Sequence, residues 1–155
     1  MRVVVLVLSC RRSPYDVLLA AQQRTWDSVV VGGVETAYYF CDGMEDMTGR
    51  LRDALRGLDG GWDFVFRTNA SSYVDKVRLF DRVRELPRRG CYCGIDGDGF
   101  ASGSGFFLSP DVAGMLVEEL SETSVEAEDV VVGQLLAACG VSVTPGAERY
   151  DYYWF

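Results

Sequence analysis

The residues best suited to acid–base chemistry lie near the end of the chain, in the segment Glu126-Ala-Glu-Asp-Val-Val-Val-Gly133. The sequence contains no histidine, so a proton-transfer step would fall to a carboxylate. Glu128 and Asp129 precede an apolar run, which places them at the start of a predicted helix as candidate general bases. A second interpretation stays open, because acidic groups there also complement the helix dipole. That dipole stabilises the charged carboxylate and weakens it as a base, unless burial offsets the effect.

A glycine-rich strand is predicted upstream of this segment, at Phe100-Ala-Ser-Gly-Ser-Gly-Phe-Phe-Leu-Ser109. Gly103, Ser104 and Gly105 interrupt its apolar residues. Glycine inside a strand indicates either that a ligand approaches the backbone closely or that the sheet bends. Both interpretations remain open from the residues alone.

The elements that must position these residues alternate between strand and helix. The run from Val3 to Ser9 is typical of a strand covered on both faces. Strands are also predicted at 29–31, 37–40, 63–67, 92–95, 100–108 and 141–143, and helices at 15–26, 47–58, 74–86, 110–120 and 129–139. This order predicts one α/β domain over residues 1–155, with a mainly parallel sheet flanked by helices. The aromatic segment from Tyr150 to Phe155 is expected to pack onto the core.

Polar residues follow several of these strands. Ligands of open parallel sheets collect beyond the carboxyl ends of the strands, so the loops at Ser9 to Arg12, Asp42-Gly43 and Asn69 to Ser72 are expected to converge on one site. The turn Asp96-Gly-Asp98 has a spacing that a metal ion could use, but turn chemistry explains it equally well.

Composition excludes several classes of function. The net charge of −8 argues against a broad nucleic-acid surface, which needs clustered Lys and Arg. The five cysteines lack the spacing of a zinc site, and buried thiols in a reducing compartment are expected. No apolar run is long enough to cross a bilayer. A soluble, cytoplasmic protein is therefore expected.

Several segments, read in order, resemble the β-1,3-glycosyltransferases of the galactosyltransferase and Fringe type, glycosyltransferase family 31, which have a GT-A fold. The order of the segments carries the resemblance, and together they span most of the chain. They are Val3 to Ser9 with Gln23-Arg24-Thr25-Trp26, Tyr38 to Gly43, Asp63 to Val74 in place of the metal-site strand, Phe100 to Ser109 in place of the Gly-Ser-Gly strand, and Glu128-Asp-Val130 with Gly133 in place of the acidic helix start.

The resemblance implies a GT-A-like, Rossmann-like fold and an inverting hexosyltransferase. Such an enzyme moves a sugar from a nucleotide-sugar donor, here a UDP-sugar, to a hydroxyl of a glycan or glycoconjugate. It implies that Asp129 is the catalytic base, with Glu128 as the alternate, and that Gly103, Ser104 and Gly105 face the acceptor. The residues expected to bind the donor are Ser9, Arg11, Arg24, Asp42, Arg67, Asn69 and Ser71.

The chain departs from this family at the metal motif. Asn69-Ala70-Ser71 stands where the family has an acidic triplet that holds a divalent metal beneath the donor diphosphate. The cofactor is therefore left unassigned: Mn²⁺ or Mg²⁺ would lack its expected ligands, whereas Asn69 and Ser71 can hydrogen-bond ribose or phosphate directly. Two other functions stay open: a non-catalytic nucleotide- or glycan-binding relative, and a metal-dependent phosphohydrolase that uses other acidic loops.

Overall fold

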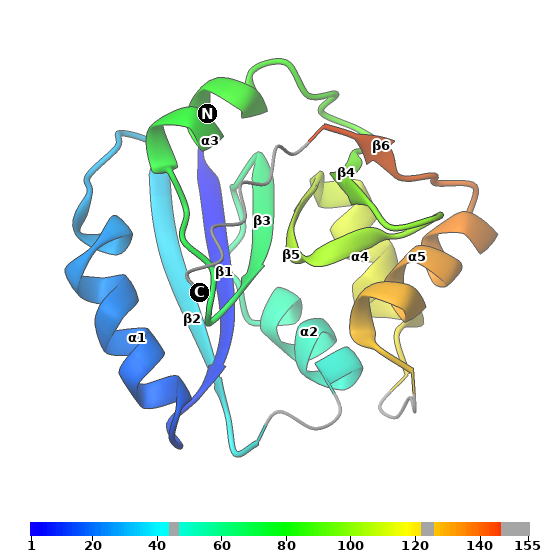
Figure 1. Cartoon of the computed structure of the whole chain (residues 1–155). Helices are drawn as coiled ribbons and strands as arrows, with labels where there is room; N and C mark the ends of the chain where they lie inside the picture. The colour runs from blue at the N-terminus through cyan, green and yellow to red at the C-terminus, as the bar shows by residue number, and fades with distance from the viewer. Residues whose placement is uncertain (44–46, 122–125, 147–155) are drawn as a thin grey trace.

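The computed structural model of the chain describes residues 1–43, 47–121 and 126–146. The aromatic segment Tyr150 to Phe155 lies outside these residues. Strands alternate with helices along most of the chain (Figure 1). In chain order the elements are β1 (Val3–Cys10), α1 (Tyr15–Arg24), the 3₁₀ helix η1 (Trp26–Ser28), β2 (Val34–Cys41), α2 (Met47–Arg56), β3 (Phe64–Asn69), α3 (Lys76–Val83), β4 (Tyr92–Asp96), β5 (Ala101–Leu108), α4 (Pro110–Glu119), α5 (Glu128–Ala138) and β6 (Thr144–Pro145).

Over the described residues, the six strands form one sheet in the order β2-β1-β3-β5-β4-β6. β1 is parallel to β2 and to β3, and β4 is parallel to β6. β5 is antiparallel to both of its neighbours, β3 and β4. The pairings Cys10 with Cys41 and Leu8 with Asn69 bring the carboxyl ends of β2, β1 and β3 to one edge of the sheet. The predicted α/β fold with a mainly parallel sheet is confirmed, with β5 as the reversed strand.

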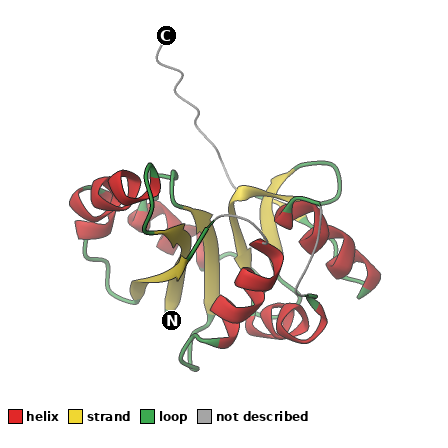
Figure 2. Cartoon of the chain, turned by 90° about the horizontal axis from the view of Figure 1, so that it is seen from below, coloured by secondary structure: helices red, strands yellow, loops and turns green. Residues whose placement is uncertain are grey.

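Helices lie on both faces of the sheet (Figure 2). Every residue of β1 is buried, because successive side chains of a strand point to opposite faces and both faces are covered. The even-numbered apolar residues of β1 pack with buried residues of α2, α4 and α5. The odd-numbered valines pack with Trp26 of η1 and with apolar residues of α3. This double burial explains the continuous apolar run at the start of the sequence.

The predicted helices differ from the observed ones mainly at their ends. The helix predicted at 15–26 ends at Arg24, and Trp26 lies in η1 with only 1% of its surface exposed. The helix predicted at 74–86 is confined to Lys76–Val83. Asp75 fixes its start, because its carboxylate accepts hydrogen bonds from the first free backbone N–H groups of the helix.

Two short predicted strands are wrong. Val31 forms only an isolated bridge to Val34, and Val30 is 94% exposed, so residues 29–31 form no strand and β2 starts at Val34. Residues 141–143 also form no strand, and β6 follows them at Thr144–Pro145. Both errors have one cause: valine favours a strand only where a neighbouring strand is available to pair with it.

The cysteines are all free thiols. Cys10, Cys41, Cys91 and Cys93 are buried, whereas Cys139 is exposed. Burial raises the pKa of the Cys91 thiol to about 12, so this thiol is protonated and packs as a small apolar side chain. Separately, none of the described helices is both long enough and apolar enough to span a membrane.

Candidate active site

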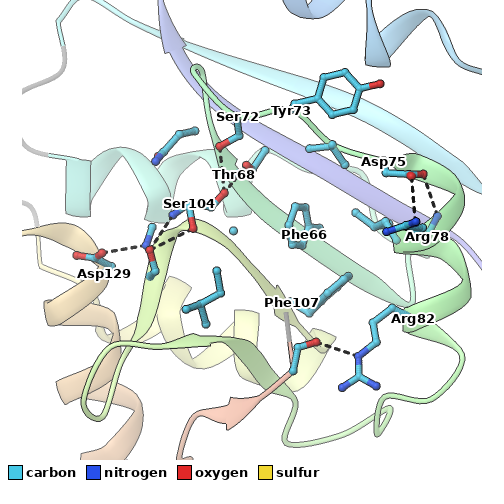
Figure 3. A pocket seen from close by; sticks show the side chains of 18 of the residues that line it. Phe66, Thr68, Ser72, Tyr73, Asp75, Arg78, Arg82, Ser104, Phe107 and Asp129 are labelled. Carbon is cyan, nitrogen blue, oxygen red and sulfur yellow. Dashed lines mark hydrogen bonds and ion pairs between the residues drawn. The ribbon is translucent and has the colours of Figure 1, made fainter. Parts of the chain in front are cut away.

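A cleft of about 1310 Å³ opens on the face of the sheet that carries α3 (Figure 3). Its floor is aromatic, because Phe66 of β3 and Phe107 of β5 lie there with ring centroids 4.6 Å apart and planes tilted by 49°. Polar residues from the end of β3, the start of β5 and the start of α5 form its rim, and α3 forms the opposite wall. An apolar floor with a few convergent polar groups is the usual composition of a small-molecule site.

The reversed direction of β5 brings two sides of the rim together. Thr68 of β3 pairs with Gly105 in the antiparallel register, which places residues 102–105 beside the end of β3. The Thr68 hydroxyl donates to the Ser104 carbonyl at 2.7 Å, and the Ser72 hydroxyl donates to the same oxygen at 3.1 Å. The loop after β3 is therefore fixed against the first half of β5.

Side chains from α1 and η1 hold the other side of this loop. Gln22 of α1 donates from Nε2 to the carbonyls of Asn69 and Ser72, at 3.2 and 3.0 Å. The indole N–H of Trp26 donates to the Ser72 carbonyl at 3.1 Å. With its carbonyls held in this way, the loop presents the side chains of Asn69 and Ser71 to the cleft.

Arg67 joins three parts of the site from beneath. Only 4% of its side chain is exposed. One guanidinium nitrogen, Nη1, donates to Asn69 Oδ1 at 2.7 Å and to the Gly103 carbonyl, and the other, Nη2, lies 2.5 Å from Glu128 Oε2. Arg67 thus connects the end of β3, the start of β5 and the start of α5. It does not line the cleft itself.

The two acidic candidates have different environments. Glu128 is buried, and burial raises the pKa of its carboxyl, while the nearby Arg67 guanidinium offsets part of that rise. Asp129 is half-buried and lines the cleft. Its Oδ2 accepts the backbone N–H of Gly103 at 2.9 Å, which orients the carboxylate toward β5 (Figure 3). Of these two candidates, Asp129 is therefore the carboxylate that a ligand in the cleft can reach.

The glycines of β5 make room for side chains of the protein. A Cβ atom at Gly103 would lie 3.3 Å from Asp129 Oδ2 and 3.4 Å from Arg67 Nη1. A Cβ atom at Gly105 would collide with the ring of Phe66. The small size of these residues thus serves the packing of the rim and the floor, a role that the sequence did not indicate. Both glycines also line the cleft, as does Ser104.

The remaining candidates for donor binding lie outside the cleft lining. Ser9 is fully buried within β1, and its hydroxyl donates to the Cys10 carbonyl at 3.5 Å. Arg11 is exposed and its guanidinium lies 4.2 Å from the centre of the Phe40 ring. Asp42 is exposed just beyond β2, and Arg24 is exposed in the last turn of α1.

The wall formed by α3 was not predicted from the sequence. Asp75, Arg78, Arg82 and Glu85 line the cleft from this side. Arg82 donates to the Gly146 carbonyl at 3.0 Å and pairs with Glu85 at 2.6 Å. The signal for this wall was the i, i+3, i+4 spacing of these polar residues, which places them on one side of a helix.

The residues at the end of β3 do not fit the divalent metal that the resemblance implies. Asn69 Oδ1 is engaged by Arg67, Ala70 is buried, and Ser71 offers a neutral hydroxyl, whereas Mg²⁺ and Ca²⁺ sites are built around carboxylates. Within the described ranges, no group of three or more Cys, Asp or Glu side chains could hold a metal ion. In the second candidate turn, Asp96 Oδ1 accepts the N–H groups of Asp98 and Gly99 at 3.0 Å each, as turn chemistry predicts.

Over the described residues, sheet topology and helix placement define a mixed α/β fold with a six-stranded, mostly parallel sheet. No family model matches the chain, and no curated protein matches its sequence. Among solved structures, the chain is similar to the catalytic domain of Drosophila β1,4-galactosyltransferase 7, solved in complex with xylobiose, with a TM-score of 0.65 and 12% identity. The match covers 94% of this chain and 65% of that chain. The likeness establishes a glycosyltransferase type of fold, but not membership of the β-1,3 family.

Proposed function

We propose that the protein is a glycosyltransferase that moves a sugar from a nucleotide-sugar, a UDP-sugar, to a hydroxyl of a glycan or glycoconjugate, with inversion at the anomeric carbon. The observation that carries this proposal is the position of Asp129. Its carboxylate lies on the rim of a cleft with an aromatic floor, and the Gly103 N–H orients it. The likeness of the fold to a galactosyltransferase catalytic domain supports it.

In the proposed reaction, Asp129 takes the proton of the acceptor hydroxyl. The hydroxyl oxygen then bonds to the anomeric carbon of the donor as the bond from that carbon to the diphosphate breaks, and the nucleoside diphosphate leaves. A positioned base contributes about 10²- to 10⁴-fold to the rate. Glu128 is the poorer candidate, because it is buried and already paired with Arg67.

The two sides of the cleft are assigned to the two substrates. Gly103, Ser104 and Gly105, next to Asp129, form the acceptor side, and the faces of sugar rings can pack on Phe66 and Phe107. Asn69 and Ser71 form the donor side. Ser9, Arg11, Arg24 and Asp42 remain proposed donor contacts only if the nucleotide extends from the cleft toward the ends of β1 and β2. The proposed role of Arg67 is to position Asn69 and Glu128.

The test is donor turnover by an Asp129→Asn chain. UDP release from UDP-glucose, UDP-galactose and UDP-N-acetylglucosamine is measured with water or added glycan as the acceptor. We expect kcat to fall by about 10²- to 10⁴-fold, with UDP affinity close to that of the wild type. Asp16→Asn, the same change at an exposed position in α1, is the matched control and should have no effect. Turnover of Asp129→Asn at the wild-type rate would exclude this base.

A non-catalytic nucleotide- or glycan-binding protein is the second candidate. The observation that favours it is the neutral Asn69-Ala70-Ser71 segment at the position of the metal motif. The same assay distinguishes the two: this candidate predicts that the wild-type chain binds UDP-sugars but releases no UDP. A metal-dependent phosphohydrolase has less support, because the described residues contain no acidic cluster for the ion.

A further inference from the structure

The orientation of the Asn69 side chain follows from its contact with Arg67. A guanidinium group carries donors only, so the atom of Asn69 that lies 2.7 Å from Arg67 Nη1 must be the amide oxygen. The amide nitrogen, Nδ2, then points away from Arg67. Asn69 is half-buried on the cleft rim, and no acceptor is paired with Nδ2 within the described part of the chain. The rim therefore offers two N–H donors at this position.

The groups next to Asn69 also suit an anion better than a cation. Arg67 is buried directly behind the amide, and its charge is balanced by Glu128 rather than by a group on the rim. A divalent ion at the rim would face this guanidinium and would find only the neutral Ser71 and Ser72 hydroxyls beside Asn69 in the loop. Asp129, the carboxylate on the same rim, already accepts the Gly103 N–H. An anion at the same place would meet N–H and O–H donors, and charge-assisted hydrogen bonds of this kind are the strong ones.

We propose that the end of β3 binds the diphosphate of the donor directly, without a divalent metal, through the Asn69 amide N–H groups and the Ser71 hydroxyl. This inference rests on the proposed function, since it specifies how that donor is held. Arg67 and Glu128 act as positioning residues: they fix the amide with its donors toward the cleft. The chain thus uses hydrogen-bond donors at the place where the resembled family uses carboxylates and a metal.

The test is calorimetric titration of UDP into the wild-type chain, once with EDTA and once with Mn²⁺. We expect the two dissociation constants to agree within about twofold, because no bound ion contributes. The Asn69→Asp chain exchanges a donor for a negative charge at nearly constant shape. We expect it to bind UDP about ten- to a hundredfold more weakly in EDTA, and to regain part of the affinity with Mn²⁺.

Two controls isolate the effect at the diphosphate. Gln134→Glu makes the same amide-to-acid change at an exposed position of α5 and should leave the affinity for UDP unchanged. Uridine, which lacks phosphates, should bind the wild-type and Asn69→Asp chains equally.

The outcomes separate the two proposals. Wild-type binding of UDP that is lost in EDTA and restored by Mn²⁺ would overturn the metal-free site but leave the transferase in place. If the Asn69→Asp chain bound UDP in EDTA as tightly as the wild type does, the contact between Asn69 and the diphosphate would be excluded. No binding of UDP or UDP-sugars under either condition would overturn the proposed function and this inference together.

Discussion

Arg67 organises the site from a buried position. Its guanidinium holds Asn69, the Gly103 carbonyl and Glu128 at once. A buried charge is costly unless it is paired, so Glu128 is the residue that allows Arg67 to remain there. Arg67 Nε and Glu128 Oε1 have no hydrogen-bond partner among the described residues, so the pair is not fully satisfied. We infer that it serves the arrangement of the rim more than the stability of the fold.

At this scale we predict that Glu128→Gln destabilises the chain strongly. The variant leaves the Arg67 charge buried without its partner, which costs about 3–5 kcal/mol of unfolding free energy. Urea denaturation measures the loss. The double variant Arg67→Met with Glu128→Leu removes both charges and should recover most of it. A loss below about 1 kcal/mol for Glu128→Gln would contradict the description of a buried, paired charge.

The contact between β5 and the start of α5 sets the position of Asp129. Gly103 gives its N–H to Asp129 and leaves the space beside it free for that carboxylate and for Arg67. We predict that Gly103→Ala displaces Asp129, costs about 1–3 kcal/mol through overpacking and lowers UDP-sugar turnover. UDP affinity should fall as well, because the same Cβ atom crowds Arg67 Nη1, which positions Asn69 on the donor side. Turnover and calorimetry are measured on the same preparation.

Gly114→Ala is the matched control for this variant. Gly114 is exposed in α4, and a Cβ atom there would meet no neighbouring heavy atom within 4 Å. The control should gain about 0.5–1 kcal/mol, since alanine is the better helix former, and should keep full turnover. If the two alanine variants behaved alike, the assigned packing at Gly103 would be wrong.

A second contact joins η1, β2 and α3. Asp27 accepts hydrogen bonds from Lys76 at 2.8 Å, from Thr36 at 2.5 Å and from Tyr38 at 2.9 Å. Burial acts to raise the pKa of Asp27, but these bonds outweigh it and lower the pKa below its ordinary value of 3.8. Because the folded state holds this proton less tightly than the unfolded state, Asp27 stabilises the fold above that value.

The resulting prediction concerns stability against pH. The difference in unfolding free energy between the wild type and Asp27→Asn should be large near about pH 6 and shrink as the pH falls toward about 3. Chemical denaturation across this range measures it. A difference that stays constant or grows in acid would show that the Asp27 contacts do not favour its charged form.

At the scale of the whole molecule, the sequence predicts the architecture better than the site. The apolar run of β1 and the alternation of strands and helices indicate an α/β sheet, because double-sided burial leaves a clear pattern. Asn69, Ser71, Gly103 and Asp129 were predicted as site residues, and all four line one cleft. They were predicted from the order of the segments that resemble the glycosyltransferase family, although each segment alone is weak evidence for that resemblance.

Other parts of the site could not be predicted, because they depend on tertiary packing. Phe66 and Phe107 are ordinary strand residues in the sequence, and they form a floor only where β3 and β5 pair. Arginine usually lies on the surface, so the sequence does not indicate that Arg67 is buried. Its burial depends on its ion pair with Glu128, which is distant in sequence. Ser9 was predicted to contact the donor from a loop after the first strand, but it lies at the buried end of β1.

An amide ¹H–¹⁵N titration with UDP in EDTA shows directly whether this cleft holds the nucleotide of a sugar donor. Asn69 is the sole asparagine of the chain, so its side-chain N–H pair can be assigned from its loss in Asn69→Asp. The proposed site predicts shifts at this pair and at the backbone amides of Gly103 and Ser104. Shifts confined to residues outside the cleft, such as Arg11 and Asp42, or no shifts at millimolar UDP either in EDTA or with Mg²⁺ in its place, would contradict it.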